Sequence, residues 1–120
     1  MKTIKFGLLA AAALGLAQMG TASLVQAQDV IKVGVIVPLT GPQAAAGQQI
    51  VAAMKLYQQF NGTKVGNKTI ELVIKDDTAV PDVTRRLAQE LIVNDKVAVL
   101  SGFGLTPLAL AVGPVITQAK

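Results

Sequence analysis

Three short apolar segments, each followed by a stretch with helical spacing, constrain the fold of this chain more than any other feature. The segments are 31–37 (IKVGVIV), 69–75 (TIELVIK) and 97–100 (VAVL). The first is apolar at nearly every position and rich in β-branched residues, as expected for a strand covered on both faces. The second alternates or runs apolar like a strand, and the third is a short apolar strand. A strand–helix order that occurs three times predicts parallel strands joined by right-handed crossovers, in a doubly wound α/β sheet.

The segments between these strands have the spacing of amphipathic helices. From residue 43 to 60 the apolar positions recur at helical intervals, at Ile50, Ala53, Met54 and Tyr57. A second helix begins near Pro81, and its apolar stripe consists of Val83, Leu87, Ala88, Leu91 and Ile92. The third helix starts with Thr106 as a hydroxyl N-cap candidate and Pro107 as the first helical residue, and it runs toward Gln118. Residues 61–67, rich in Gly and Asn, are expected to form an exposed return.

The first 27 residues have the outline of a secretory signal. Lys2 and Lys5 precede an unbroken apolar run, FGLLAAAALGL at 6–16. A helix that crosses a bilayer needs about 20 apolar residues, so this run is too short. We expect cleavage after Ala27, with cleavage after Ala22 as the alternative, and an uncleaved N-terminal anchor as the alternative to a signal. The expected organisation is therefore a signal peptide at 1–27 and one folded segment at 28–120.

The composition excludes several classes of site. The chain has no His and no Cys, so it lacks disulfides and the usual zinc ligands. Its 11 basic residues are scattered apart from Arg85-Arg86, and aromatic residues make up 3%, so no nucleic-acid partner is expected. No phosphate loop, serine elbow or histidine base is present, and the pattern at 102–107 breaks the dinucleotide fingerprint. We expect no enzyme, no metal and no cofactor.

In an open parallel sheet, ligands bind beyond the carboxyl ends of the strands. Three segments of this chain end there: 38–47, 76–81 and 101–107. Thr106, at a helix start, has two equally weighted interpretations, a simple N-cap or a group that binds an anion. Asp76-Asp77 has the form of a metal or phosphoryl-accepting pair, but we expect it to stabilise its loop and the start of the next helix.

Three stretches, taken together, resemble one protein family. They are IKVGVIVPLTGPQAAAGQQ at 31–49, the strand end Lys75-Asp76-Asp77 before Pro81, and VAVLSG at 97–102 with the helix after it. On these residues the chain resembles the leucine/isoleucine/valine-binding family, the type I periplasmic binding proteins of branched-chain amino acid ABC transporters. The resemblance extends over essentially all of 28–120. It implies two α/β lobes that close around a solute, with this chain as a fragment holding three β-α units of an incomplete first lobe.

The resemblance also implies site residues. In this family a Ser or Thr at the loop–helix junction after the third strand binds the α-carboxylate of the ligand, and Thr106 occupies the matching position. Ala46 stands before Gly47 where the family often has an aromatic residue, so the side-chain subsite departs from the leucine pattern. The ligand-binding residues expected on this basis are Thr106, Gly104, Leu105, Ala46 and Thr40.

The function implied is that of a monomeric periplasmic solute-binding protein that delivers a small polar solute to a membrane permease. An amino acid or amide of the branched-chain type is the expected solute, although short amides, urea-like solutes and aromatic acids are also compatible with these residues. A ligand-sensing domain of the same fold is the main alternative, and an exported enzyme that uses Asp76 or Asp77 with a metal is a third. An isolated half-sheet of three strands would leave apolar edges and faces uncovered, so the segment alone is expected to have low stability.

Overall fold

The computed structural model describes residues 29–119 of the chain, so the predicted signal peptide and both cleavage positions lie outside the described residues. The elements follow in the order β1 (Asp29–Val37), α1 (Ala44–Asn61), β2 (Lys64–Val65), β3 (Lys68–Asp76), α2 (Pro81–Val93), β4 (Val99–Gly102) and α3 (Thr106–Gln118). The three predicted strand–helix units are confirmed. The third strand begins at Val99 instead of Val97 and continues to Gly102.

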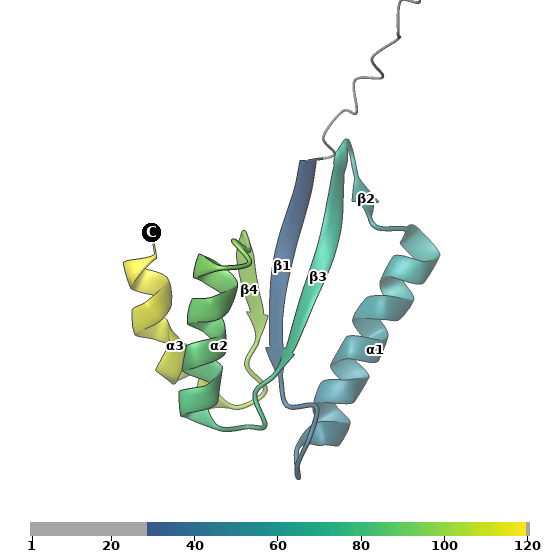
Figure 1. Cartoon of the computed structure of the whole chain (residues 1–120). Coiled ribbons are helices and arrows are strands. Elements are labelled where there is room, and N and C mark those ends of the chain that lie inside the picture. The colour runs from purple at the N-terminus through teal and green to yellow at the C-terminus, as the bar shows by residue number, and fades with distance from the viewer. Residues whose placement is uncertain (1–28, 120) are drawn as a thin grey trace, which may run out of the picture.

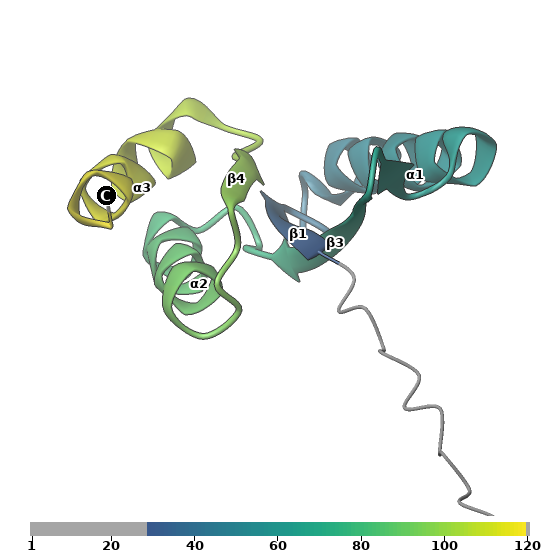
Figure 2. The ribbon, with the colours of Figure 1, turned by 90° about the horizontal axis from the view of Figure 1, so that it is seen from above.

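The strands form one sheet with the order β2-β3-β1-β4. Strand β1 lies at its centre and pairs in parallel with both β3 and β4, with Val37 opposite Asp76 and Ile36 opposite Gly102. The carboxyl ends of these three strands therefore meet at one edge, the lower edge in Figure 1. Helix α1 covers one face of the sheet and α2 and α3 lie on the other, as the view from above shows (Figure 2). This is the predicted doubly wound arrangement.

Strand β2 is a feature that the sequence analysis did not predict. Residues 61–67 contain half of a short hairpin, in which β2 pairs antiparallel with the start of β3, Val65 opposite Lys68. Gly66, at the first central position of the turn, has a φ of 62°. A two-residue hairpin turn of type II′ requires such a positive φ, and glycine adopts it without steric cost. The expected exposed return is thus a β-hairpin. Strand β2 has only two residues, too few to show the alternating pattern of a strand in the sequence.

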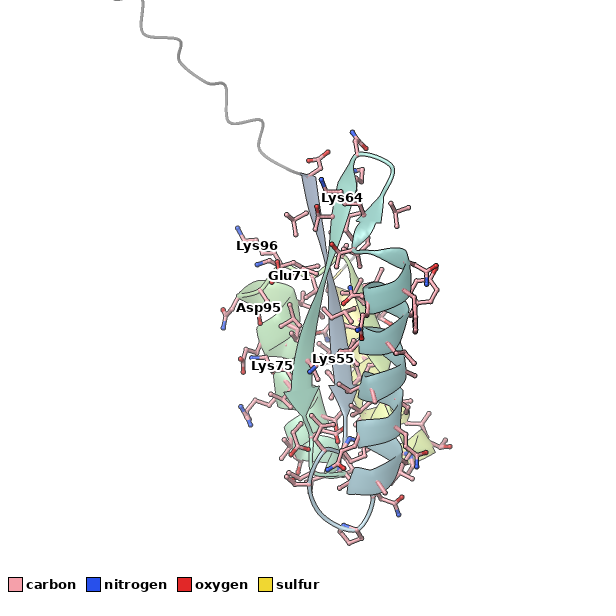
Figure 3. All side chains as sticks on the ribbon, turned by 90° about the vertical axis from the view of Figure 1, so that its right-hand side faces the viewer. Lys55, Lys64, Glu71, Lys75, Asp95 and Lys96 are labelled. Carbon is pink, nitrogen blue, oxygen red and sulfur yellow. The ribbon has the colours of Figure 1, made fainter. Side chains whose placement is uncertain are left out.

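The packed core lies between the sheet and helices α2 and α3. Ile36 of β1 is fully buried against Leu87, Ala88 and Leu91 of α2 and Val112 of α3. Of the predicted apolar stripe of the second helix, Leu87, Ala88 and Leu91 belong to this core and Val83 packs against it, while Ile92 lies outside the cluster. Opposite charges add a link between sheet and helix, because the Nζ of Lys75 on β3 lies 2.7 Å from a carboxylate oxygen of Glu90 on α2 and 4.0 Å from one of Asp95 (Figure 3).

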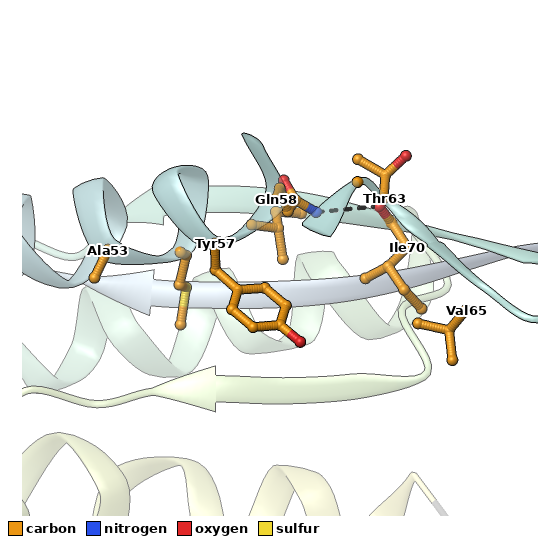
Figure 4. A pocket seen from close by; sticks show the side chains of 9 residues that line it. Ala53, Tyr57, Gln58, Thr63, Val65 and Ile70 are labelled. Carbon is orange, nitrogen blue, oxygen red and sulfur yellow. Dashed lines mark hydrogen bonds between the residues drawn. The ribbon is translucent and has the colours of Figure 1, made fainter. Parts of the chain in front are cut away.

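Helix α1 is packed less closely against its side of the sheet. Tyr57 is 68% exposed and Ile50 37% exposed, although both belong to the predicted apolar stripe. A cavity of about 390 Å³ separates the helix from the strands; its lining residues are Ala53, Met54, Tyr57, Gln58, Gly62, Thr63, Val65, Ile70 and Leu72 (Figure 4). One hydrogen bond crosses it, from the side-chain amide of Gln58 to the carbonyl of Ile70 at 3.3 Å. Among residues 29–119, no helix has both the length and the apolar character of a membrane span.

Candidate functional site

Three loops meet at the carboxyl edge of the sheet: the β1–α1 loop (38–43), the β3–α2 loop (77–80) and the β4–α3 loop (103–105). The first and third are in direct contact, because a Cβ on Gly104 would lie 3.1 Å from the Cδ atom of Pro38. The backbone N–H of Phe103 donates to the carbonyl of Ile36 at 2.8 Å. Phe103 has a left-handed φ of 61° and packs against the core cluster, so the β4–α3 loop is held in a conformation rare for a bulky residue.

Asp76 links the β1–α1 loop to the β3–α2 loop. Its Oδ1 accepts hydrogen bonds from the backbone N–H of Leu39 at 2.8 Å and of Thr78 at 2.9 Å. Its Oδ2 accepts the hydroxyl of Thr40 at 2.6 Å. The carboxylate therefore holds both loops at once.

These contacts favour the ionised form of Asp76. The hydroxyl of Thr40 is the largest influence that lowers the pKa of this carboxyl below its ordinary value of 3.8, and backbone N–H groups of Leu39, Thr78 and Thr40 lower it further. Partial burial acts in the opposite direction and is outweighed. At neutral pH the side chain is a negative charge at the site edge, and it can only accept hydrogen bonds.

The carboxylate of Asp77 bonds its own loop and helix α2, while its backbone N–H donates to the carbonyl of Val37 on β1 at 3.4 Å. It is fully buried and accepts hydrogen bonds from the backbone N–H of Ala79 at 3.0 Å and from the hydroxyl of Thr84 at 2.9 Å. The expectation that Asp76 and Asp77 stabilise this loop and the helix start is confirmed. Within residues 29–119, no group of three or more His, Cys, Asp or Glu side chains is placed to hold a metal ion.

Thr106 is not the N-cap of the third helix, so this prediction is wrong by one residue. Leu105 occupies the N-cap position with an extended backbone, Thr106 is the first helical residue and Pro107 is the second. A residue inside the helix does not direct its hydroxyl to the N–H groups of the first turn, and no side-chain cap is formed. In the described part of the chain, the hydroxyl of Thr106 and the backbone N–H groups of Leu105 and Thr106 have no hydrogen-bond partner.

This helix start is therefore suited to an anion. The unpaired N–H groups and the partial positive charge of the helix N-terminus both favour a negative group there. The first turn of α3 contains no acidic residue that would repel it. Thr106 is exposed, as are Gly104 and Leu105 beside it.

The start of α1 is pressed against the end of β1. Gly47 is buried, and a Cβ at this position would lie 1.8 Å from the carbonyl oxygen of Pro38, so only glycine permits this approach. Ala46, the residue before it, is exposed in the first turn of the helix. Its side chain is a single methyl group, where the resemblance leads one to expect an aromatic ring.

The predicted site residues thus fall into two groups at one edge of the sheet. Gly104, Leu105 and Thr106 lie in or next to the β4–α3 loop, while Thr40 lies in the β1–α1 loop and Ala46 in the first turn of α1. Asp76 lies in the segment 76–81 that was expected at this edge, but it was not among the predicted ligand-binding residues. Its only sequence signal is a carboxylate at a strand end, and its contact with Thr40 depends on β3 being the neighbour of β1.

The large cavity under α1 is a poorer candidate for the site. It lies on one face of the sheet and not at the carboxyl edge, and nearly all its lining groups are apolar. The amide of Gln58 is already engaged with Ile70. A site for a small polar solute needs several convergent polar groups, and the loop edge provides them.

Comparison with known proteins identifies relatives along most of the described chain. A family model described as "Periplasmic binding protein" matches residues 30–120. A curated relative, the "Leu/Ile/Val-binding protein homolog 6" of Brucella abortus (strain 2308), is 44% identical over 93 residues, which cover 77% of this chain and 24% of the relative. The chain thus spans about a quarter of the length of the curated relatives it matches.

Solved structures show the same fold. A solute-binding protein of an ABC transporter from Rhodopseudomonas palustris BisB5, in complex with 3,4-dihydroxybenzoic acid, is 60% identical with a TM-score of 0.73, covering 75% of this chain and 25% of that one. A second solute-binding protein from R. palustris, in complex with 4-hydroxybenzoate, is 41% identical with a TM-score of 0.72, covering 76% and 25%.

Proposed function

This chain belongs to the periplasmic binding protein family, and from that premise we propose that residues 28–120 are the N-terminal part of lobe one of an ABC-transporter solute-binding protein that captures a small carboxylic acid. The observation that carries this proposal is the start of α3. There the free hydroxyl and N–H of Thr106, the helix dipole and the absence of acidic residues provide a site for a carboxylate.

The solute class we favour is an aromatic carboxylic acid bearing hydroxyl groups. The relative with 60% identity is in complex with 3,4-dihydroxybenzoic acid, and another binds 4-hydroxybenzoate. Ala46 supports this choice, because its small side chain leaves space for a ring where a larger residue would project. A branched-chain amino acid is the second candidate, supported by the name of the Brucella relative. Both solutes present a carboxylate to Thr106.

The uncovered face of α1 supports the assignment to a larger lobe. The apolar side chains around the 390 Å³ cavity lie open in residues 29–119, and apolar area of this kind is normally buried by further elements of a domain. We propose that the lobe and a second lobe close around the solute and dock on a membrane permease in the periplasm, as a monomer. The relatives are binding proteins of transporters and not enzymes, which supports binding without catalysis.

The decisive experiment is calorimetric titration of the protein extended to the length of its relatives. Dihydroxybenzoate, hydroxybenzoate, benzoate and leucine are the solutes. We expect a hydroxybenzoate to bind, and Thr106→Ala to weaken its binding by about tenfold or more, because a hydrogen bond to a charged group is lost. Thr106→Ser keeps the hydroxyl and should retain most of the affinity. Thr117→Ala is the matched control, since that hydroxyl donates to the carbonyl of Gly113 within the same helix.

Each result has a distinct meaning. Binding of leucine alone would replace the aromatic acid by the amino acid, and binding of none of the four would contradict the carboxylic-acid proposal. Uptake of the labelled acid by cells distinguishes transport from sensing. A transport protein requires that uptake fall when the gene is deleted, whereas a sensing domain of the same fold would leave uptake intact and alter gene expression or signalling.

A further inference from the structure

The contact between Asp76 and Thr40 joins a charged residue outside the predicted site to a residue inside it. The two residues are 36 positions apart in the chain, and the hydroxyl of Thr40 lies 2.6 Å from the Oδ2 of Asp76. Thr40 is exposed at the carboxyl edge, and Asp76 is half-buried. The backbone of the same loop is held by the second carboxylate oxygen, through the N–H of Leu39 at 2.8 Å.

The direction of the hydrogen bond between Thr40 and Asp76 follows from elementary chemistry. An ionised carboxylate has no hydrogen to donate, so the hydroxyl of Thr40 must be the donor. A threonine hydroxyl has a single hydrogen and two lone pairs. Once its hydrogen is directed to Asp76, the hydroxyl can only accept a hydrogen bond from a third group.

We propose that Asp76 is a positioning residue of the solute site, which fixes the β1–α1 loop and holds the hydroxyl hydrogen of Thr40, so that Thr40 faces the solute only as a hydrogen-bond acceptor. The inference rests on the proposed function, because it requires that this loop border the solute. Asp76 itself does not touch the solute; it acts through Thr40 and through the backbone of Leu39.

The arrangement sets an orientation for the solute. A carboxylate placed near Thr40 would meet an acceptor and, behind it, the negative charge of Asp76, whereas the start of α3 offers donors. The carboxylate therefore binds at Thr106, and a hydrogen-bond donor elsewhere on the solute, such as a ring hydroxyl, binds at Thr40. The site should prefer a hydroxybenzoate to the corresponding methoxybenzoate, which has lost the donor but kept the oxygen.

Asp76→Asn reverses the direction of the hydrogen bond between residues 76 and 40. The carbonyl oxygen of the amide can still accept the N–H groups of Leu39 and Thr78, as Oδ1 does now. The NH₂ group then takes the place of Oδ2 and donates to the oxygen of Thr40, which frees the hydroxyl to donate to the solute. The probes are the 3- and 4-hydroxybenzoates and the 3- and 4-methoxybenzoates, titrated into the protein extended to the length of its relatives.

The expected result is a change in selectivity. The affinity ratio of hydroxy to methoxy compound should fall by about tenfold in Asp76→Asn for at least one ring position, corresponding to one hydrogen bond. The methyl group of the methoxybenzoate has the same steric effect in wild type and variant, so it cancels when their affinity ratios are compared. Thr40→Val should abolish the preference, and adding Asp76→Asn to Thr40→Val should change it no further, since Asp76 acts through Thr40.

Asp77→Asn is the matched control, because the carboxylate of Asp77 bonds Ala79 and Thr84 and, among the described residues, accepts no hydrogen bond from the β1–α1 loop. It should lower the melting temperature and leave the selectivity ratio unchanged. If Asp76→Asn leaves the ratio unchanged while the probes still bind, the proposed role of Asp76 is wrong. A ratio that moves equally in Asp76→Asn and Asp77→Asn would also overturn it, because general loosening would then explain both.

A second measurement needs no solute and therefore separates this inference from the proposed function. Amide hydrogen exchange at Leu39 and Thr78 should accelerate by about tenfold or more in Asp76→Ala, while Ala79, held by Asp77, stays protected. Asp77→Ala should produce the reverse pattern. Unchanged exchange at Leu39 would overturn the positioning role. Failure of all four probes to bind, with exchange at Leu39 accelerated, would contradict the proposed solute class and leave the loop-positioning role supported.

Discussion

At the scale of single residues, two adjacent acids have different roles because their strand end sends them in different directions. Asp76 accepts hydrogen bonds from the neighbouring β1–α1 loop, whereas Asp77 is buried under its own loop and bonded to Thr84. Neighbouring residues at the end of a strand point to opposite faces, so a pair of like residues cannot share one environment. The carboxylate of Asp76 is thereby joined to the β1–α1 loop and to Thr40.

The pH dependence of stability should report the contacts of Asp76. Its pKa in the folded protein is lowered by the hydroxyl of Thr40 and the backbone N–H groups, so its stabilisation is fully present above the ordinary value of 3.8 and is lost as pH falls through the lowered pKa. Urea unfolding of the extended protein should therefore show a difference between wild type and Asp76→Asn that shrinks below pH 3.8. Thr40→Val should weaken this pH dependence, because it removes the largest cause. A difference that stays constant through acid would contradict the assigned contacts.

At the scale of elements, the position of α1 depends on one close approach to the end of β1. Gly47 lies in the first turns of the helix, where an alanine would ordinarily be preferred by about 1 kcal/mol. The carbonyl of Pro38 occupies the space that the alanine Cβ would need. Packing therefore requires a glycine here, and this packing sets where the helix and its exposed Ala46 lie relative to the loop.

Gly47→Ala should lower the free energy of unfolding by about 1–3 kcal/mol, the usual cost of overpacking, in spite of the gain in helix propensity. Ala52→Gly, at an exposed position of the same helix, measures propensity alone and should cost about 1 kcal/mol. Urea titration of both variants compares the two effects. A neutral or stabilising Gly47→Ala would mean that α1 is not held against Pro38.

At the scale of the whole molecule, the two faces of the sheet differ in how well they are covered. The face under α2 and α3 has a fully buried cluster that includes Ile36 and Leu91. The face under α1 keeps an open apolar cavity, and Tyr57 and Phe60 are 68% and 79% exposed. Within residues 29–119 the packed core cluster therefore lies on the first face, while the second face leaves large apolar side chains exposed.

This asymmetry predicts opposite effects of one substitution in two proteins. Residues 28–120 produced alone should self-associate through the face under α1, and Tyr57→Lys should shift sedimentation toward the monomer. In the protein extended to the length of its relatives, Tyr57→Lys should instead lower the melting temperature, because the proposed further elements of the lobe would bury the new charge. Gln59→Lys, exposed on the same helix, should have little effect in either protein. Equal behaviour of Tyr57→Lys in both proteins would mean that nothing covers this face.

Local patterns in the sequence determined the strand and helix segments, their order and the doubly wound class. These features depend on spacing over a few residues, such as the apolar run of β1 and the stripe of α2. Proline before a stripe also located the start of α2 correctly, at Pro81. For α3 the same signal placed the start one residue late, because the N-cap depends on backbone angles and not on residue type alone.

Tertiary structure decided the rest. The pairing of β2, the open cavity under α1 and the bond between Asp76 and Thr40 all depend on which segments become neighbours. A hydrogen bond between residues 36 positions apart has no periodic signal in the chain, since it exists only once β3 lies beside β1. The candidate ligand positions were therefore predictable as loops at one edge of a sheet. The direction of the Thr40 hydrogen, and with it the donor or acceptor character of the site, was set only by packing those loops together.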